Sequence, residues 1–313
     1  MIVVAGEALI DLVPERTSSA AAGDRLPALR PARGGGPYNT ALALGRLGSP
    51  TAFCSRVSTD GFGEALLAGL RKDGVDTALV QRGEEPTTLA VASIGADGSA
   101  GYGFYVQGTA DRLFTLPPSL PEGVSALSLG TCSLVLEPGA SAYEELLRRE
   151  AARGVFTLLD PNIRTGLIPD ADAYRARFRG WLPHVGLLKL SIEDARWLAD
   201  SEDVETAVGE WLAAGPAAVV LTRGGEGLSV RRQDGSVLSV PGERVDVVDT
   251  IGAGDTVNAA LLHRLAAHQA LSAPALAKLD DAAWRDVLGF AARAAAITCS
   301  RAGAEPPYAS ELA

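Results

Sequence analysis

The residues with the clearest chemical meaning lie in one short run in the C-terminal third of the chain. Residues 248–256 read Val-Asp-Thr-Ile-Gly-Ala-Gly-Asp-Thr, and the apolar four-residue spacing that follows predicts a helix. The N–H groups of Gly252, Ala253 and Gly254 are then expected at the N-terminus of that helix, where unpaired donors and the helix dipole attract anions. Asp255 would stand beside them. An anion site next to a proton-accepting carboxylate suits transfer of a phosphoryl group to a hydroxyl.

Two N-terminal segments carry polar side chains suited to a polyol. Residues 6–11 place Asp11 after the first expected strand, where open α/β sheets bind ligands. Residues 34–39 join three glycines, which allow close backbone approach, to Asn39, which can both donate and accept hydrogen bonds. Each feature also has a plainer interpretation. Asp11 can be a solvated loop acid, Asn39 and Asp255 can each cap a helix, and the glycines can simply form turns.

Two further segments could act on phosphate or metal. Arg164 follows the expected strand 157–160 and could stabilise charge on a transferring phosphate, or could simply lie on the surface. Glu193 and Asp194 could orient water around a magnesium ion. The alternative is that Ser191 caps the next helix, with these acids in its first turn.

Composition excludes several other classes of protein. The 313 residues carry a net charge of −10, which disfavours nucleic acid as a partner. No apolar run approaches the roughly 20 residues of a membrane span, so we expect no membrane partner. The three cysteines are far apart, which indicates a reducing, cytoplasmic location. The three histidines lack metal-binding spacing, and the sequence contains neither a P-loop nor a dinucleotide G-x-G-x-x-G motif after its first strand.

Short apolar runs alternate with helical patterns, which indicates an α/β fold with a central, mostly parallel sheet and helices on both faces. Strands are predicted at residues 2–5, 51–57, 126–130, 157–160, 186–190 and 217–222. Helices are predicted at 39–47, 63–72, 142–153, 204–214 and 282–299. Ser141 and Glu144 form a capping-box pattern for the third of these helices.

Two stretches break this alternation. Residues 11–33 contain three prolines and no helical period, and residues 87–107 alternate around Asp97-Gly98, a favourable hairpin turn. We interpret 11–33 and 87–107 as one small β-sheet lid inserted into an α/β body made of residues 1–10, 34–86 and 108–313. A second hairpin is expected at 228–240 around Asp234-Gly235.

Taken in order, these motifs resemble the ribokinase-like (PfkB) family of carbohydrate kinases over nearly the whole chain. The resemblance rests on G-E-x-x-x-D at residues 6–11, G-G-x-x-x-N at 34–39, D-P-N-x-R at 160–164 and D-T-x-G-A-G-D at 249–255. It implies that Asp255 is the general base and that the amides of residues 252–254 bind the γ-phosphate. Arg164 would lie near the phosphates, and a lid would exclude water.

The resemblance also implies roles for residues that the chemistry alone does not assign. The sugar-binding residues would be Asp11, Gly34, Gly35, Asn39, Tyr105 and Asn162, together with Asp255. The ATP-binding residues would be Lys189, Ser191, Thr222, Gly224, Gly225, Gly227, Asn258, Gly303 and Ala304. Asp249 and the carbonyl of Ile251 would hold a potassium ion, and Glu193 and Asp194 would act on Mg²⁺ through water. The family often has glutamate where this chain has Asp194.

The sugar is the least determined part of this prediction. The start of the chain, the lid strand at 86–89 and residues 104–111 look most like bacterial fructokinases. Related kinases of 2-keto-3-deoxygluconate commonly place an arginine after the lid aromatic pair, where this chain has Val106. A substrate carboxylate would lack a charged partner there, which favours fructose. Ribose and a nucleoside remain possible.

Two other classes and one assembly are kept as alternatives. A non-catalytic sugar-binding regulator would be expected to have a damaged Asp255 motif, and an NAD-dependent dehydrogenase would need a glycine fingerprint after the first strand, where this chain has Gly6-Glu7-Ala8. The exposed edge of the lid sheet could pair with a second copy to give a homodimer.

Overall fold

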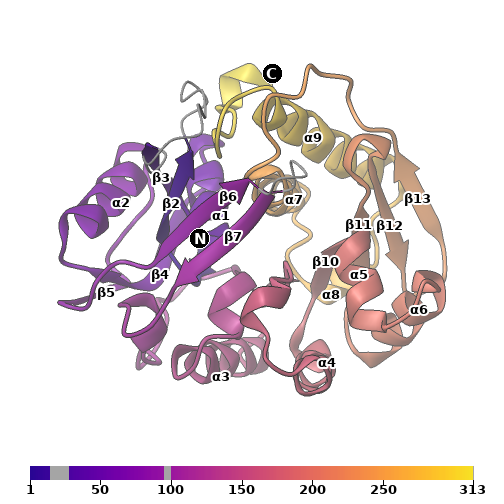
Figure 1. Ribbon diagram of the computed structural model, residues 1–313. Helices are drawn as coiled ribbons and strands as arrows, with labels where there is room; N and C mark the ends of the chain where they lie inside the picture. The colour runs from indigo at the N-terminus through magenta and orange to yellow at the C-terminus, as the bar shows by residue number, and fades with distance from the viewer. Residues whose placement is uncertain (15–27, 95–99, 313) are drawn as a thin grey trace.

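The computed structural model describes residues 1–14, 28–94 and 100–312, and these contain two separate sheets (Figure 1). The larger sheet has nine strands in the order β13-β12-β11-β10-β9-β8-β1-β4-β5. Its strands are β1 (Ile2–Ala5), β4 (Thr51–Ser58), β5 (Val80–Gly83), β8 (Ala126–Gly130), β9 (Phe156–Asp160), β10 (Leu187–Ser191), β11 (Ala218–Thr222), β12 (Leu228–Arg232) and β13 (Val237–Val240). All pairs are parallel except β11–β12 and β12–β13.

Helices cover both faces of the large sheet. One face packs against α1 (Gly36–Arg46), α2 (Gly61–Lys72), α7 (Ala253–Ala267), α8 (Ala273–Leu276) and α9 (Asp281–Cys299). The other face packs against α3 (Gly139–Ala152), α4 (Ala171–Trp181), α5 (Ile192–Ala199) and α6 (Val204–Ala214). Within β1, Val4 belongs to the first core and Val3 to the second, because successive side chains point to opposite faces. The sheet is therefore buried on both sides, as parallel sheets require.

The smaller sheet has four strands in the order β3-β2-β6-β7. They are β2 (Leu9–Pro14), β3 (Leu29–Gly34), β6 (Leu89–Ile94) and β7 (Ala100–Tyr105). Figure 1 shows them on the indigo-to-magenta side of the molecule, across from β12, β13 and α9. The two stretches interpreted as a lid thus supply one sheet, with β2 starting at Leu9 rather than at Asp11. The proposed Asp97-Gly98 turn lies outside the described residues.

Most predicted elements are confirmed to within a few residues. The predicted spans 2–5, 126–130 and 204–214 coincide with β1, β8 and α6, and the second hairpin is formed by β12 and β13. The Ser141–Glu144 capping box is wrong. Helix α3 begins earlier, at Gly139, and the N–H and Oγ of Ser141 instead donate to Glu137, at 3.1 and 2.9 Å. In the described part of the chain, no helix combines the length and apolarity that a membrane span needs.

Asp60 links the small sheet to the body. Its carboxylate caps α2 by accepting from the Gly63 N–H at 2.7 Å. The same carboxylate accepts from the N–H of Thr87 at 2.9 Å and from its Oγ1 at 2.7 Å, just before β6 begins. The Asp60 side chain thus fixes both the start of α2 and the segment that leads into β6.

We predict that Asp60→Ala lowers the free energy of unfolding by about 2–3 kcal/mol, because it removes a cap and two further hydrogen bonds. Asp170→Ala is the matched control, since Asp170 caps α4 through a single bond to the Ala173 N–H at 2.9 Å, and should cost about 1 kcal/mol. Urea unfolding of both variants measures the difference. Equal losses of unfolding free energy in the two variants would show that Asp60 does not link the small sheet to the body.

Candidate active site

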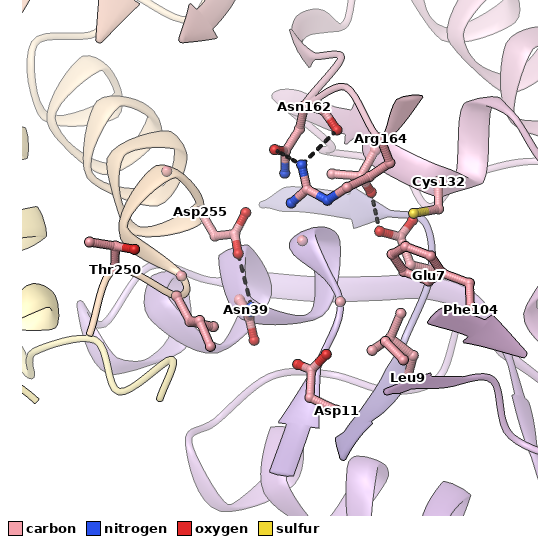
Figure 2. A pocket seen from close by; sticks show the side chains of 17 residues that line it. Glu7, Leu9, Asp11, Asn39, Phe104, Cys132, Asn162, Arg164, Thr250 and Asp255 are labelled. Carbon is pink, nitrogen blue, oxygen red and sulfur yellow. Dashed lines mark hydrogen bonds between the residues drawn. The ribbon is translucent and has the colours of Figure 1, made fainter. Parts of the chain in front are cut away.

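The topology places one large cavity at the carboxyl edge of the main sheet. Strand β1 lies between β4 and β8, so the loops after β1 and β8 diverge there and leave a crevice. The cavity has a volume of ≈ 470 Å³. It is lined by Glu7, Leu9, Asp11, Gly35, Gly36, Asn39, Ala90, Phe104, Thr131, Cys132, Asn162, Arg164, Thr250, Ile251, Gly252, Gly254 and Asp255. Loops from both ends of the chain and three strands of the small sheet, β2, β6 and β7, therefore meet around one space (Figure 2).

Asp255 is the buried carboxylate of this cavity. It lies in the first turn of α7, is 7% exposed, and accepts a hydrogen bond from Asn39 Nδ2 at 2.9 Å (Figure 2). Burial raises its pKa to about 7, while the Asn39 hydrogen bond opposes that rise. Asn39 is not a helix cap, because α1 starts from Gly35 and places Asn39 inside the helix. Asp255 does not cap α7 either, since Gly252 occupies that position.

The glycine turn provides unpaired backbone donors. Gly252 starts α7 in the left-handed conformation, with φ of 77°, which favours glycine. A Cβ at this position would also approach the Cβ of Ala304 to 2.6 Å. The Ala253 N–H donates to the Thr250 carbonyl at 3.3 Å, whereas the N–H groups of Gly252 and Gly254 find no partner among the described residues. Free donors at a helix start are suited to binding an anion.

Arg164 is the cationic side chain among the residues lining the cavity. Its guanidinium donates to Asn162 Oδ1 at 2.8 Å and points toward Asp255 (Figure 2). Asp11 lies across the cavity on β2, and burial raises its pKa to about 6, against the lowering effect of Arg164. Gly34 does not line this cavity. A Cβ on it would lie 2.0 Å from Asp11 Oδ2, so its lack of a side chain leaves room for that carboxylate.

A second cavity of ≈ 240 Å³ lies on the other side of the glycine turn. The predicted ATP loop contributes Thr222, Gly224, Gly225 and Gly227, and apolar residues from the 242–247 loop and α9 complete it. The two cavities share Thr250 and Gly254 in their walls. The glycine turn therefore lies between a polar cavity with a carboxylate and a mostly apolar cavity.

Five predicted nucleotide-binding residues lie elsewhere. Lys189 and Asn258 are 3% and 4% exposed, and both donate to Asp160 Oδ2 at 2.8 Å. The Oγ of Ser191 accepts from the Asp194 N–H at 3.0 Å, which confirms the helix-cap interpretation. Gly303 and Ala304 pack behind the glycine turn, where the Gly303 N–H donates to Asp249 at 2.9 Å. None of the five lines the second cavity.

Tyr105 is also placed differently from its prediction. It is 65% exposed and does not line the cavity, whereas its neighbour Phe104 does. The alternation of side chains along β7 explains the exchange. Glu7, for which the sequence patterns predict no role, is 3% exposed, lines the cavity, and accepts from Thr131 Oγ1 and from the Ser133 N–H. Its position directly after β1 was the signal that could have identified it.

The predicted metal ligands do not form a dedicated cage. The described residues contain no cluster of three or more metal-ligating side chains. Glu193 is exposed, whereas Asp194 is partly buried and accepts from the Ile163 N–H at 3.1 Å, so these two acids do not converge. Asp249 accepts from the N–H groups of Ile251 and Gly303, at 3.0 and 2.9 Å, which fixes its carboxylate within the loop.

Comparison with known proteins agrees with this geometry. Residues 1–311 match the pfkB family of carbohydrate kinases. The chain belongs to this family. It is 41% identical to a fructokinase of Rhizobium leguminosarum bv. trifolii over 288 residues, 91% of this chain and 86% of that protein. It is 32% identical to fructokinase-1 of Oryza sativa subsp. japonica over 317 residues, 100% of this chain and 95% of that protein.

The fold agrees as well. The crystal structure of a fructokinase from Xylella fastidiosa with bound ATP superposes with a TM-score of 0.89. The two chains are 27% identical, and the match covers 99% of this chain and 96% of the other. This pfkB-family chain is thus a carbohydrate kinase with a ribokinase-like fold.

The buried carboxylate should reduce stability at high pH. The folded-state pKa of Asp255, about 7, lies above its ordinary value of 3.8, so the stability that protonation provides is lost as pH rises toward and through 7. We predict that Asp255→Asn raises the melting temperature by a few degrees at pH 8 and by less at pH 5. Differential scanning calorimetry at both pH values measures this. Asp172→Asn, at an exposed site on α4, is the control, and a pH-independent effect of Asp255→Asn would contradict the assignment.

Proposed function

We propose that this chain is an ATP-dependent fructokinase. The observation that carries the proposal is the position of Asp255, buried in the polar cavity beside the free amides of Gly252 and Gly254, of which Gly254 also lines the second cavity. Family membership supports the reaction class, and the bacterial and plant relatives named as fructokinases support the sugar. The bound ATP of the Xylella fastidiosa fructokinase supports the nucleotide.

The reaction follows from this arrangement. Asp255 takes the proton of a sugar hydroxyl, and the hydroxyl oxygen then forms a bond to the γ-phosphorus as the bond to the β-phosphate oxygen breaks. The amides of Gly252 and Gly254 hold the phosphoryl oxygens, with Ala253 between them. Arg164 balances charge on the transferring group. The products are the sugar phosphate and ADP.

The metal requirements are proposals of the same kind. Mg²⁺ would enter with ATP and neutralise phosphate charge, since the residues that the structure describes hold no group of three or more metal-ligating side chains. Asp249, fixed by two backbone donors beside the glycine turn, is the residue that would face a potassium ion together with the Ile251 carbonyl. Dependence of activity on potassium over sodium tests that site.

The charges of the polar cavity favour a neutral sugar. Glu7, Asp11 and Asp255 line it, and Arg164 is the cation among its lining residues. A substrate carboxylate, as in 2-keto-3-deoxygluconate, would meet more negative than positive charge there. Val106 is buried outside the cavity wall and offers no charge. Hydroxyl groups, in contrast, donate well to carboxylates.

We further propose that residues 11–33 and 87–107 act as a lid over the body. Leu9, Ala90 and Phe104 bring apolar surface from the small sheet to the polar cavity, and apolar cover keeps competing water from the phosphate. A homodimer through the lid edge is part of the proposal, and its test is the mass in solution. The three free cysteines fit a reducing, cytoplasmic location.

We predict strong ATP turnover with fructose in a panel that includes ribose, tagatose, adenosine and 2-keto-3-deoxygluconate, with magnesium and potassium present. A coupled ADP assay measures it. Turnover on the keto-acid alone would refute the sugar assignment while leaving the kinase reaction intact. Sugar binding without any turnover would favour the non-catalytic regulator.

We predict that Asp255→Asn lowers kcat by about 10²–10⁴-fold, the usual contribution of a general base, while leaving the fold intact. Because the base must be ionised, kcat/KM of the wild type should fall about tenfold per pH unit below the Asp255 pKa of about 7. Steady-state rates from pH 5 to 9 check both statements. Near-normal turnover of the variant would remove Asp255 from this role.

A further inference from the structure

A buried ion pair lies directly behind the glycine turn. Lys189 Nζ donates to Asp160 Oδ2 at 2.8 Å, and the two side chains are only 4% and 3% exposed. Asn258 Nδ2 donates to the same carboxylate oxygen at 2.8 Å. None of the three residues lines the polar cavity or the apolar one. Buried charges are costly to keep in a core, so a pair in this position calls for an explanation.

The two ends of the pair face different parts of the site. A Cβ placed on Gly254 would lie 3.0 Å from Lys189 Nζ, so the ammonium packs against the backbone of the anion turn. Asp160 and Asp255 both line a third, very small cavity of ≈ 10 Å³, together with Asn258. The positive end therefore lies beside the phosphate donors and the negative end beside the base.

Two residues that line the small cavity each carry a buried oxygen without a partner in the described part of the chain. Asp160 Oδ1 and Asn258 Oδ1 are buried without a hydrogen-bond partner among the described residues. Unsatisfied buried acceptors are costly, and a cavity of this volume accommodates about one water molecule, which would donate to both. Such a water would hold the pair and Asn258 rigidly behind the base.

We propose that Lys189 and Asp160 are positioning residues. The positive charge of Lys189 acts on the anion turn, and the negative charge of Asp160 acts on Asp255. The ammonium strengthens the anion turn from behind, and the carboxylate makes Asp255 a better proton acceptor. This inference rests on the proposed role of Asp255 as base. It gives Lys189 and Asp160 a role that does not depend on the predicted contact of Lys189 and Asn258 with the nucleotide.

The charged and polar groups around Asp255 determine in which direction each member of the pair shifts its pKa. The groups that act on it are Asn39 from α1, Asp160 from β9, Lys189 from β10 and Arg164 from the loop after β9. Burial contributes most to its raised pKa, Asp160 raises it further, and Asn39, Lys189 and Arg164 lower it. Removing the charge of Asp160 should therefore lower the pKa of Asp255, and removing the charge of Lys189 should raise it.

The test compares Asp160→Asn, Lys189→Met and the double variant with the wild type. The acid limb of the kcat/KM profile should move to lower pH by about one unit in Asp160→Asn and to higher pH by about one unit in Lys189→Met. Each single variant should lose at least about tenfold in kcat. The double variant removes both charges, so its acid limb should lie between those of the single variants. It also avoids the unpaired buried charge that threatens folding of the single variants.

Glu150→Gln is the matched control, since Glu150 is a fully buried carboxylate paired with Arg149 and Arg153 on α3, outside both cavities. It should lose stability without moving the acid limb. Acid limbs that stay in place, or that move the same way in both single variants, would reduce the pair to a structural role and overturn the proposal.

A second readout separates this inference from the choice of sugar. The ¹³C resonance of the Asp255 carboxyl, assigned by its loss in Asp255→Asn, can be titrated without substrate. Opposite shifts of its midpoint in the two single variants would support the charge division even if fructose proved to be the wrong sugar. Unchanged midpoints would overturn it even if fructose were phosphorylated.

Discussion

The hydrogen bond from Asn39 to Asp255 is the contact on which the site depends. It links α1 to α7 across 216 residues of sequence and gives a carboxylate removed from water one of its few partners. Because burying a charge is costly, Asp255 can occupy this position only when both helices are docked on the same face of the sheet. Formation of the site is therefore tied to completion of the core, not to any single segment.

In the proposed reaction one turn would serve two cavities, because phosphoryl transfer needs the sugar hydroxyl and the phosphate in line. Thr250 and Gly254 line both the polar cavity and the apolar one, and the Gly254 amide is free among the described residues. Positioning and charge neutralisation account for most of the catalysis in this reaction class. A fixed helix start with unpaired donors supplies both without large side chains.

The same arrangement carries a stability cost. Glu7, Asp11 and Asp255 have pKa values raised by burial, so keeping them ionised opposes folding. Hydrogen bonds from Thr131, Ser133 and Asn39 offset part of this cost at Glu7 and Asp255. Active sites commonly reduce the stability of the fold in this way, because their ionisable groups are shielded from water inside a cavity.

The sequence by itself determined the features that depend on neighbours along the chain. The glycine turn, the helix after it, the alternation of strands and helices and the position of polar residues after strands follow from local spacing, and the structure contains each of them. Tertiary structure alone decided which side chains meet. It placed Lys189 and Asn258 on Asp160, turned Phe104 rather than Tyr105 into the cavity, and brought Glu7 to its wall. These outcomes depend on the packing of segments far apart in sequence, and local patterns do not encode the direction in which a buried side chain finds its partner.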